Sequence, residues 1–378
     1  MSVERPRFTV GIEEEYLLVE ADTRDLVRDP PQELWDDLTA ALGDEVGSEF
    51  MRSQVEIQTK PCADIAEARQ DITAKRRTVC EIAERYNLHA IAASTHPFAD
   101  WGRQLHTDKE RYNLLARDMQ GVVRRLLISG MHVHVGIEDP DVRIDLMSQV
   151  SYFLPHLLAL STSSPFWHSE DTGLKSYRMS VFKALPRTGL PEHFNSWAEY
   201  ERHVNVLVEA GIFEDASRVW WDIRPSAAFP TLEMRIADIC TNIEDGIAIA
   251  AVYTSLLSML FTKRQLNQRW RTYSNFLIAE NLWRAQRYGI NEALMDFGIG
   301  ELVPFHQLTE ELIEILTPEA TRLGCLPEVE HIRTIVGRGT SADRQLAVYE
   351  KALAEGNETR DALKRVVDFL IEETKVGL

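Results

Sequence analysis

Basic residues are scarce in this 378-residue chain, which has 41 lysines and arginines against 59 aspartates and glutamates and a formal net charge of −18. The longest basic run is Lys75-Arg76-Arg77, in a segment that also contains acidic residues. An acidic protein repels nucleic acids and anionic membrane surfaces. We therefore expect no nucleic-acid partner, and we expect any anionic substrate to need local neutralisation, for which bound divalent cations are suited.

Cysteine and long apolar runs are also scarce. The four cysteines are scattered and form no CxxC pair, which argues against a disulfide framework and indicates reduced thiols in a cytoplasmic protein. The N-terminus, Met-Ser-Val-Glu-Arg-Pro-Arg, is too polar for a signal peptide. The longest apolar stretch, between Asp245 and Lys263, is shorter than the ~20 residues of a membrane span. It predicts a buried core helix and no membrane association.

Hydrophobic periodicity predicts an α+β fold. Polar and apolar residues alternate at period two in segments 8–19, 51–59, 128–137, 219–224 and 231–237, with a shorter apolar strand at 89–94. Such alternation is typical of an antiparallel sheet whose two faces differ in environment. Helical patterns cover 64–86, 142–162, 196–210, 243–263 and 274–287, and the chain after about 308 is almost wholly helical. With no linker or repeat, residues 1–378 are predicted to form one catalytic domain with a helical C-terminal part at about 308–378.

The polar strand faces carry carboxylates. Glu13 and Glu15 are two residues apart and point to the same face, whereas Glu14 points to the other. A lone pair of this kind is usually just exposed to solvent. Here the pattern repeats on the other predicted strands, at Glu56, His132, Glu233 and Arg235. The sequence therefore predicts the wall of a polar cavity, with oxygen ligands of the kind that Mg²⁺ or Mn²⁺ prefers.

Arg224 and Arg235 add cationic groups to these faces. Guanidinium groups make forked contacts with phosphates and carboxylates. Carboxylates that hold metals, together with arginines, suit phosphoryl transfer from ATP. No Walker A motif is present, and Gly337-Arg338-Gly339 is too weak a glycine pattern to replace one. Any ATP site is therefore expected to be a metal-and-arginine cradle on a sheet.

Two alternatives remain open from the residues alone. His132 and His134 form an H-x-H pair on a strand, which zinc-dependent hydrolases use, and His96 could join them. The other histidines fall mostly in polar, helical or loop segments, and His134 could instead be a partly buried histidine bonded to the backbone. The second alternative is a nucleotide-binding protein without catalysis.

A set of ordered motifs resembles a known family. Gly11-Ile12-Glu13-Glu14-Glu15 resembles the G-I-E-x-E signature of glutamate–cysteine ligases. The further landmarks are Glu56-Ile57-Gln58-Thr59, Ser94-Thr95-His96-Pro97-Phe98, Glu110-Arg111-Tyr112, Gly130-Met131-His132-Val133-His134-Val135-Gly136, Trp221-Asp222-Ile223-Arg224-Pro225, Glu233-Met234-Arg235 and Trp283-Arg284-Ala285-Gln286-Arg287-Tyr288-Gly289. From about Phe8 to the last helices, the chain resembles the bacterial carboxylate–amine ligases called glutamate–cysteine ligase type 2.

This resemblance implies a fold and a reaction. The implied fold is glutamine-synthetase-like, with a curved, mostly antiparallel sheet that forms a funnel and is covered by helices. ATP would enter at one end and the amino-acid substrates at the other, with Mg²⁺ or Mn²⁺ between them. The implied reaction activates the γ-carboxylate of glutamate as an acyl phosphate, which an amine then converts to an amide. A homodimer is implied by the resemblance alone.

The resemblance also implies residue roles. The expected metal ligands are Glu13, Glu15, Glu56, His132 and Glu233. Arg235 and Arg224 are the expected catalytic arginines, and the expected substrate or nucleotide contacts are Arg178, His134, Arg235 and Arg224. Some relatives carry a further carboxylate four residues before the Glu56 position, where this chain has Arg52, and Glu49 is a candidate replacement. No motif identifies the acceptor amine, and cysteine need not be the preferred one.

Overall fold

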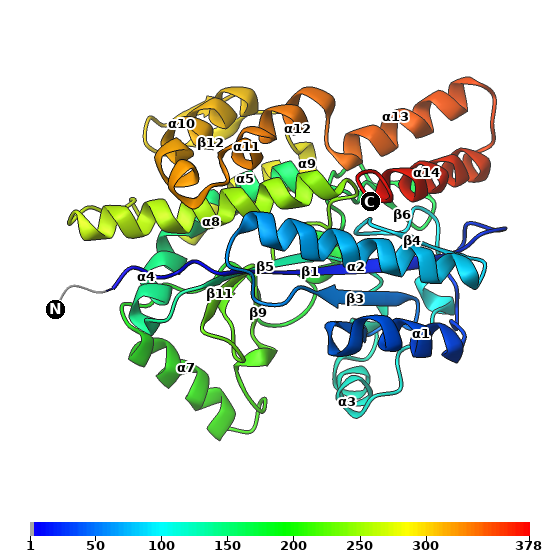
Figure 1. The fold of residues 1–378 in the computed structure, drawn as a ribbon, viewed down its shortest axis with the longest axis horizontal. Coiled ribbons are helices and arrows are strands. Elements are labelled where there is room, and N and C mark those ends of the chain that lie inside the picture. Colours follow the sequence, from blue (N-terminus) through cyan, green and yellow to red (C-terminus); the bar gives the residue numbers. More distant parts are fainter. Residues whose placement is uncertain (1–3) are drawn as a thin grey trace.

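The computed structural model describes residues 4–378, and a seven-stranded sheet lies at its centre (Figure 1). Its strands are β1 (Val10–Glu20), β2 (Val46–Ser48), β3 (Gln54–Gln58), β4 (Leu88–Ile91), β5 (Met131–Gly136), β10 (Ile223–Pro225) and β11 (Thr231–Met234). They follow the order β10-β11-β5-β1-β3-β2, and β4 pairs with the second half of β1. Every pairing in this sheet is antiparallel and the sheet is open, which confirms the predicted fold class.

Helices and three small two-stranded sheets surround the main sheet. The helices are α1 (Gln32–Leu42), α2 (Ile65–Arg85), α3 (Glu110–Met119), α4 (Pro140–Val150), α5 (Leu154–Ser161), α6 (Arg178–Phe182), α7 (Trp197–Glu209), α8 (Ile243–Gln265), α9 (Asn275–Tyr288), α10 (Phe305–Leu323), α11 (Leu326–Glu330), α12 (Ile332–Arg338), α13 (Ser341–Ala354) and α14 (Thr359–Thr374). The small strand pairs are β6 (Phe166–Trp167) with β7 (Glu170–Asp171), β8 (Thr188–Gly189) with β9 (Trp220–Trp221), and β12 (Leu294–Asp296) with β13 (Glu301–Val303). Helices α2 and α8 cover one face of the sheet and α1 packs against α2, whereas α3 and α7 lie on the other side in the view of Figure 1.

The apolar face of the sheet forms the core with α2 and α8. Ile12 and Tyr16 of β1, Ile57 of β3 and Val133 of β5 are at most 2% exposed. Their alternate neighbours point to the opposite face, as the period-two pattern predicts. The core therefore fixes which residues of each strand face the other side.

Glu14 is the polar exception on this buried face. Its carboxylate pairs with Arg76 of α2, with 2.6 Å between Oε1 and Nη2, and it also accepts a hydrogen bond from the Tyr16 hydroxyl. Arg76 donates to the carbonyl oxygens of Cys240 and Thr241 as well, at 3.1 and 2.8 Å. Arg76 and Glu14 are almost completely buried. This network joins β1 to α2 and to the segment that leads into α8.

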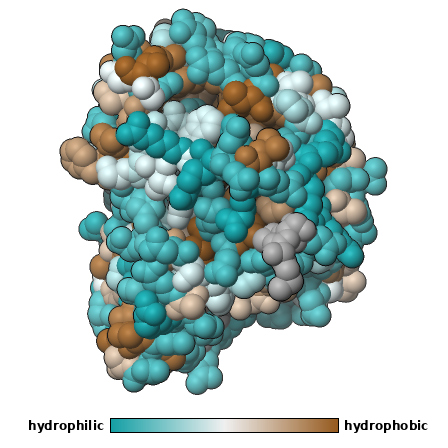
Figure 2. Space-filling model, turned by 90° about the vertical axis from the view of Figure 1, so that its left-hand side faces the viewer, coloured by the Kyte–Doolittle hydropathy of each residue, from teal (hydrophilic) through white to brown (hydrophobic). Residues whose placement is uncertain are grey.

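Helix α8 is the predicted core helix. Its N-cap Asn242 accepts a hydrogen bond from the Glu244 amide, and Lys263 and Arg264 lie in its last turn. Among the helices in residues 4–378, α8 is the one long and apolar enough to cross a membrane, but almost all of it is buried inside the fold. Helices α2, α4, α5, α10, α11 and α12 pack around it. The space-filling view shows a mainly hydrophilic face with small, separate apolar patches (Figure 2).

Several element boundaries differ from the predictions. The predicted helix 142–162 is interrupted at Ser151–Phe153, because Pro155 has no amide hydrogen to donate to the carbonyl four residues earlier. The predicted strand 51–59 begins only at Gln54. Arg52 therefore does not share the cavity-facing row with Glu56 and pairs with Asp29 at 2.8 Å. Helices α1 and α3 were not predicted.

The chain after residue 304 folds into α10–α14, so the prediction of a helical C-terminal part is correct. The main apolar core contains residues from Phe8 to Ile335 without division into separate units. A second cluster joins β1 and β4 to α14. This continuity agrees with one catalytic domain, which stays a prediction.

Candidate active site

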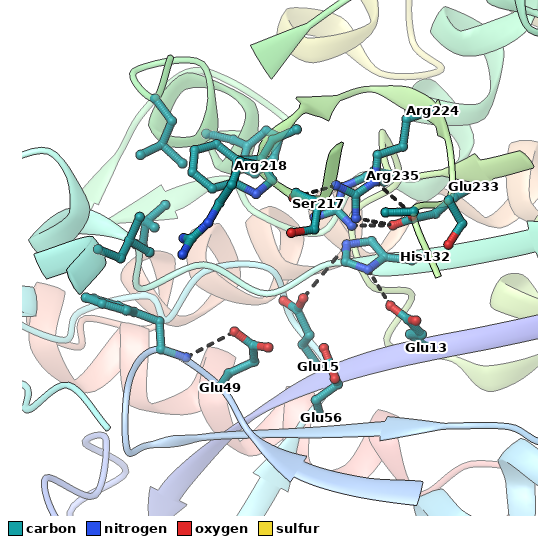
Figure 3. Close-up of a pocket in the computed structure, with 18 of the residues that line it drawn as sticks. Glu13, Glu15, Glu49, Glu56, His132, Ser217, Arg218, Arg224, Glu233 and Arg235 are labelled. Carbon is teal, nitrogen blue, oxygen red and sulfur yellow. Dashed lines mark hydrogen bonds and ion pairs between the residues drawn. The ribbon is translucent and has the colours of Figure 1, made fainter. Parts of the chain in front are cut away.

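The polar face of the sheet forms the floor of a cavity of about 510 Å³. This volume is in the range of small-molecule binding sites. The floor residues are Glu13 and Glu15 on β1, Glu56 on β3, His132 and His134 on β5, Arg224 on β10 and Glu233 on β11. Arg178 and Arg235 also line the cavity. The structure thus brings together all nine predicted site residues, and Figure 3 shows seven of them by label.

Strand register places these side chains opposite one another. Glu13 lies across from His132, and Glu15 lies across from Glu56. Glu233 lies across from His134 on one side and from Arg224 on the other. Directly opposed residues have Cβ atoms about 5 Å apart, so each pair can interact across the strands. A one-residue slip of any strand would remove its side chain from the cavity.

Glu13 lies between the two histidines. Its carboxylate oxygens are 2.8 Å from His132 Nδ1 and 3.1 Å from His134 Nε2. Burial by itself would raise the pKa of Glu13, but hydrogen bonds from both imidazoles outweigh burial and hold this pKa well below its usual value. Burial lowers the pKa of His132 to about 4, so its imidazole is neutral at pH 7 and can act as a ligand. His134 Nδ1 lies 2.9 Å from the Thr231 hydroxyl, which fixes the ring orientation.

Glu15, Glu49 and Glu56 form a crowded group of carboxylates. Burial, together with the Glu49 charge, raises the pKa of Glu15 to about 8. Burial and the neighbouring carboxylates, Glu49 first among them, raise the pKa of Glu56 well above its usual value. Glu15 also accepts a 2.8 Å hydrogen bond from the Gly130 amide. Buried like charges repel one another unless they are protonated or bridged by a cation, so this group fits a divalent metal.

A second observation supports a metal site on the floor. Glu13, His134 and Glu233 each place one ligand atom within 4.8 Å of the others. Carboxylate oxygens with an imidazole form a donor set that Mg²⁺ or Mn²⁺ can use. The geometry thus adds His134 to the candidate ligands, and the ligand roles of Glu13, Glu15, Glu56, His132 and Glu233 all stay predictions.

Two arginines share Glu233. Arg224 Nε lies 2.8 Å from Glu233 Oε2, and Arg235 pairs with Oε1. Burial would raise the pKa of Glu233, but Arg235 and Arg224 together hold it well below its usual value. Glu233 is therefore a carboxylate at neutral pH, and both guanidinium groups are directed towards the cavity floor.

Arg178 is a buried residue at the start of α6 and not a surface arginine. Its guanidinium donates to the carbonyl oxygens of Arg235 and Ile236, at 3.0 and 3.3 Å. Gly130 makes room for it, because a Cβ at this position would lie 2.5 Å from Arg178 Nη2. Arg178 thus supports the backbone of Arg235 and places a positive charge beside Glu15.

His96 does not join the other histidines. Its Nδ1 accepts hydrogen bonds from the amides of Phe98 and Ala99, and its Nε2 is 2.9 Å from the Arg24 carbonyl oxygen. Both ring nitrogens are therefore occupied by backbone groups. The three-histidine zinc site considered from the sequence does not form.

Sequence reasoning missed part of the cavity. Glu49 was noted as a further acidic residue, and the structure places it on the cavity wall. Arg218 was not considered, because it lies one residue before the predicted strand 219–224, although it has the same phase as Trp220 and Arg224. Asp222 has the same phase but leaves the cavity, because the chain bends there between β9 and β10. It is 1% exposed, and within residues 4–378 neither carboxylate oxygen has a hydrogen-bond partner.

Residues 9–368 match the family model described as "Glutamate-cysteine ligase family 2(GCS2)". The chain belongs to this family. It is 60% identical to a protein of Rhodospirillum rubrum, covering 99% of this chain and 97% of that protein, and 52% identical to one of Jannaschia sp., covering 98% of both. Both relatives carry the name "Putative glutamate--cysteine ligase 2". Membership makes this chain an ATP-dependent carboxylate–amine ligase, and the hydrolase alternative is not favoured.

Solved structures show the same fold at low identity. A glutamate–cysteine ligase of Francisella tularensis, in complex with AMP, superimposes with a TM-score of 0.68 and 16% identity, covering 100% of this chain and 90% of that one. A bifunctional glutathione synthetase of Pasteurella multocida gives a TM-score of 0.67 and 15% identity, with 97% and 52% coverage. These likenesses show that the antiparallel sheet and its helices form the fold of glutamate–cysteine ligases.

Proposed function

We propose that the protein uses Mg-ATP to join the γ-carboxylate of glutamate to an amine through an acyl phosphate. The observation that carries this proposal is the cavity floor, where carboxylates and imidazoles of four strands face Arg178, Arg224 and Arg235. The AMP bound to the Francisella tularensis ligase agrees with a nucleotide substrate. Glutamate as the activated acid rests on the family and on the names of the relatives.

The first step transfers a phosphoryl group. A γ-carboxylate oxygen of glutamate forms a bond to the γ-phosphorus of ATP, the bond to the bridging oxygen breaks, and ADP leaves with the electron pair. Arg235 and Arg224 are placed to hold phosphate oxygens, since both guanidinium groups already pair with an anion, Glu233. When bound, Mg²⁺ or Mn²⁺ would neutralise the phosphate charges.

The residues that would hold the metal are the carboxylates and imidazoles of the cavity floor and its edge. They are Glu13, Glu15, Glu56, His132 and Glu233, joined by His134 and Glu49. The neutral imidazole of His132 and the ionised carboxylate of Glu13 are the protonation states that ligation needs.

The second step forms the amide. The free amine attacks the acyl carbon, a C–N bond forms, the C–O bond to phosphate breaks, and phosphate leaves. One proton passes from the nitrogen to water or to the departing phosphate. Activation is needed because a free carboxylate is a poor electrophile and phosphate is a good leaving group.

Hydroxylamine provides a direct test. The purified protein is incubated with Mg-ATP, glutamate and hydroxylamine, and γ-glutamyl hydroxamate, ADP and phosphate are measured. We expect all three products in equal amounts, with no hydroxamate when either ATP or the metal is omitted. ATP binding without any product from a panel of carboxylates would overturn the proposal in favour of a non-catalytic nucleotide-binding protein.

Two further properties are proposed with the same function. We expect a cytoplasmic protein, in line with its four buried free cysteines. We also expect a homodimer, which sedimentation analysis of the purified chain would test.

A further inference from the structure

The cavity has an apolar wall beside its ionic floor. Leu115, Leu126, Ile128, Phe182 and Leu185 line it. Ile128, Phe182 and Leu185 belong to a small apolar cluster that is separate from the main core, and Leu126 packs against this cluster. Leu115 comes from α3, which was not predicted from the sequence. Three distant segments therefore combine to present hydrocarbon to the cavity.

Arg218 also faces the cavity, at the C-terminal end of a short 3-10 turn (Ala216–Arg218). Asp215 caps this turn through a 2.7 Å hydrogen bond from the Ser217 amide, and the Arg218 carbonyl accepts one from Arg187 Nε at 2.9 Å. The backbone at Arg218 is thus held in place. Figure 3 shows its guanidinium reaching into the cavity on the side away from Glu13 and Glu233.

Arg218 differs from the other arginines that line the cavity. Arg224 and Arg235 pair with Glu233, and Arg178 donates to two carbonyl oxygens. The guanidinium of Arg218 makes no hydrogen bond or ion pair with any residue in the described part of the chain, and it is half-buried. Its donors are therefore available to a ligand. A single unpaired guanidinium next to a hydrocarbon wall is complementary to a molecule with one carboxylate and one apolar group.

We propose that this half of the cavity is the subsite for the acceptor amine, and that the acceptor is an apolar α-amino acid. Arg218 binds its carboxylate, the apolar wall binds its side chain, and its amine faces the floor, where the acyl phosphate forms. The inference rests on the proposed ligase function and names the substrate class of its second step.

The other substrates fit this half less well. Glutamate has two carboxylates and ATP a triphosphate, so both need several cationic groups, which the floor supplies through Arg178, Arg224 and Arg235. Apolar α-amino acids therefore match this half of the cavity better than a nucleotide does.

The test compares acceptors in the full-length protein with Mg-ATP and glutamate. Hydroxylamine is too small to need the acceptor subsite. Hydroxamate formation therefore measures acyl-phosphate formation independently of acceptor binding. We expect kcat/KM for leucine or phenylalanine to exceed that for glycine by about 10-fold or more, since apolar pockets discriminate side chains by 10- to 200-fold. Leucinamide, which has no carboxylate, should be poorer than leucine by a similar factor.

The results of this comparison separate the proposed acceptor subsite from the proposed ligase function. Hydroxamate formation with no preference for apolar amino acids, or with leucinamide as good as leucine, overturns the subsite and leaves the ligase function standing. A complete absence of hydroxamate overturns both. Cysteine preferred over leucine would also contradict an apolar acceptor.

Replacement of Arg218 tests the carboxylate contact. In Arg218→Gln the ratio of kcat/KM for leucine to that for hydroxylamine should fall by about 10- to 100-fold, and Arg218→Lys should restore part of it. Arg202→Gln, an exposed arginine of α7, is the matched control and should leave this ratio unchanged. A higher KM for ATP in Arg218→Gln, with an unchanged ratio, would show that Arg218 binds the nucleotide and would overturn the proposal.

Discussion

The buried pair of Arg76 and Glu14 gives a sharp prediction about stability. In Arg76→Met the Glu14 carboxylate keeps only its hydrogen bond from the Tyr16 hydroxyl, and the carbonyl oxygens of Cys240 and Thr241 lose their guanidinium donor. Removing one partner of a buried ion pair costs about 3–5 kcal/mol, because the remaining charge is left in the interior. We expect Arg76→Met to lower the free energy of unfolding by this amount in urea titrations followed by circular dichroism.

A neighbouring arginine provides the control. Arg77 is exposed on the same helix, so Arg77→Met should change the free energy of unfolding by less than about 0.5 kcal/mol. The double variant Glu14→Gln/Arg76→Met should lose less than the sum of its single variants, because neither isolated charge then remains buried. A loss below 1 kcal/mol in Arg76→Met, or strict additivity in the double variant, would refute the view that this pair holds β1 against α2.

Three further predictions concern the site and its surroundings. Glu13→Gln should weaken Mn²⁺ binding at least about 10-fold in titration calorimetry with an unchanged unfolding midpoint, and equal affinity would contradict its role as a ligand. Gly130→Ala should displace the Arg178 guanidinium, lower stability by about 1–3 kcal/mol and reduce ligase activity, whereas a fully active, equally stable variant would show that Arg178 can move without cost. Burial raises the pKa of Asp222 to about 6 from 3.8, so the folded wild type holds a proton that the unfolded chain releases. The free energy of unfolding should therefore fall by roughly 3 kcal/mol as pH rises from below 4 to above 6. In Asp222→Asn the urea midpoint should vary less with pH between pH 4 and 7 than in the wild type. The same pH dependence in both proteins would contradict this prediction.

The sequence predicted the floor of the site well because strand phase is a local property. Side chains two residues apart on a strand share a face, so Glu13 and Glu15 had to face the same way and Glu14 the opposite way. The apolar residues Ile12 and Tyr16, which share a face with Glu14, set which face is buried. The same logic placed Glu56, His132 and Glu233.

The residues that were misjudged lie where the chain leaves a regular strand. Arg52 precedes the first residue of β3, and Asp222, which the predicted strand 219–224 would place on the same face as Arg224, lies at a bend between two short strands. Glu49 and the apolar wall belong to segments whose position depends on long-range packing, such as α3 against the end of β2, where the Tyr112 hydroxyl donates to the Ser48 carbonyl. Sequence periodicity carries no information on such contacts.

The burial of α8 has a consequence for folding during synthesis, because its packing partners are not all made before it. Its apolar surface is covered in part by α10, α11 and α12, which follow it in the chain. When α8 has just been synthesised, the nascent chain therefore contains a helix apolar enough to cross a membrane, while α10, α11 and α12 are not yet available to cover it. Truncation after α9 would leave that surface permanently open, so such fragments should bind chaperones or aggregate, even though every residue of the cavity floor has already been synthesised.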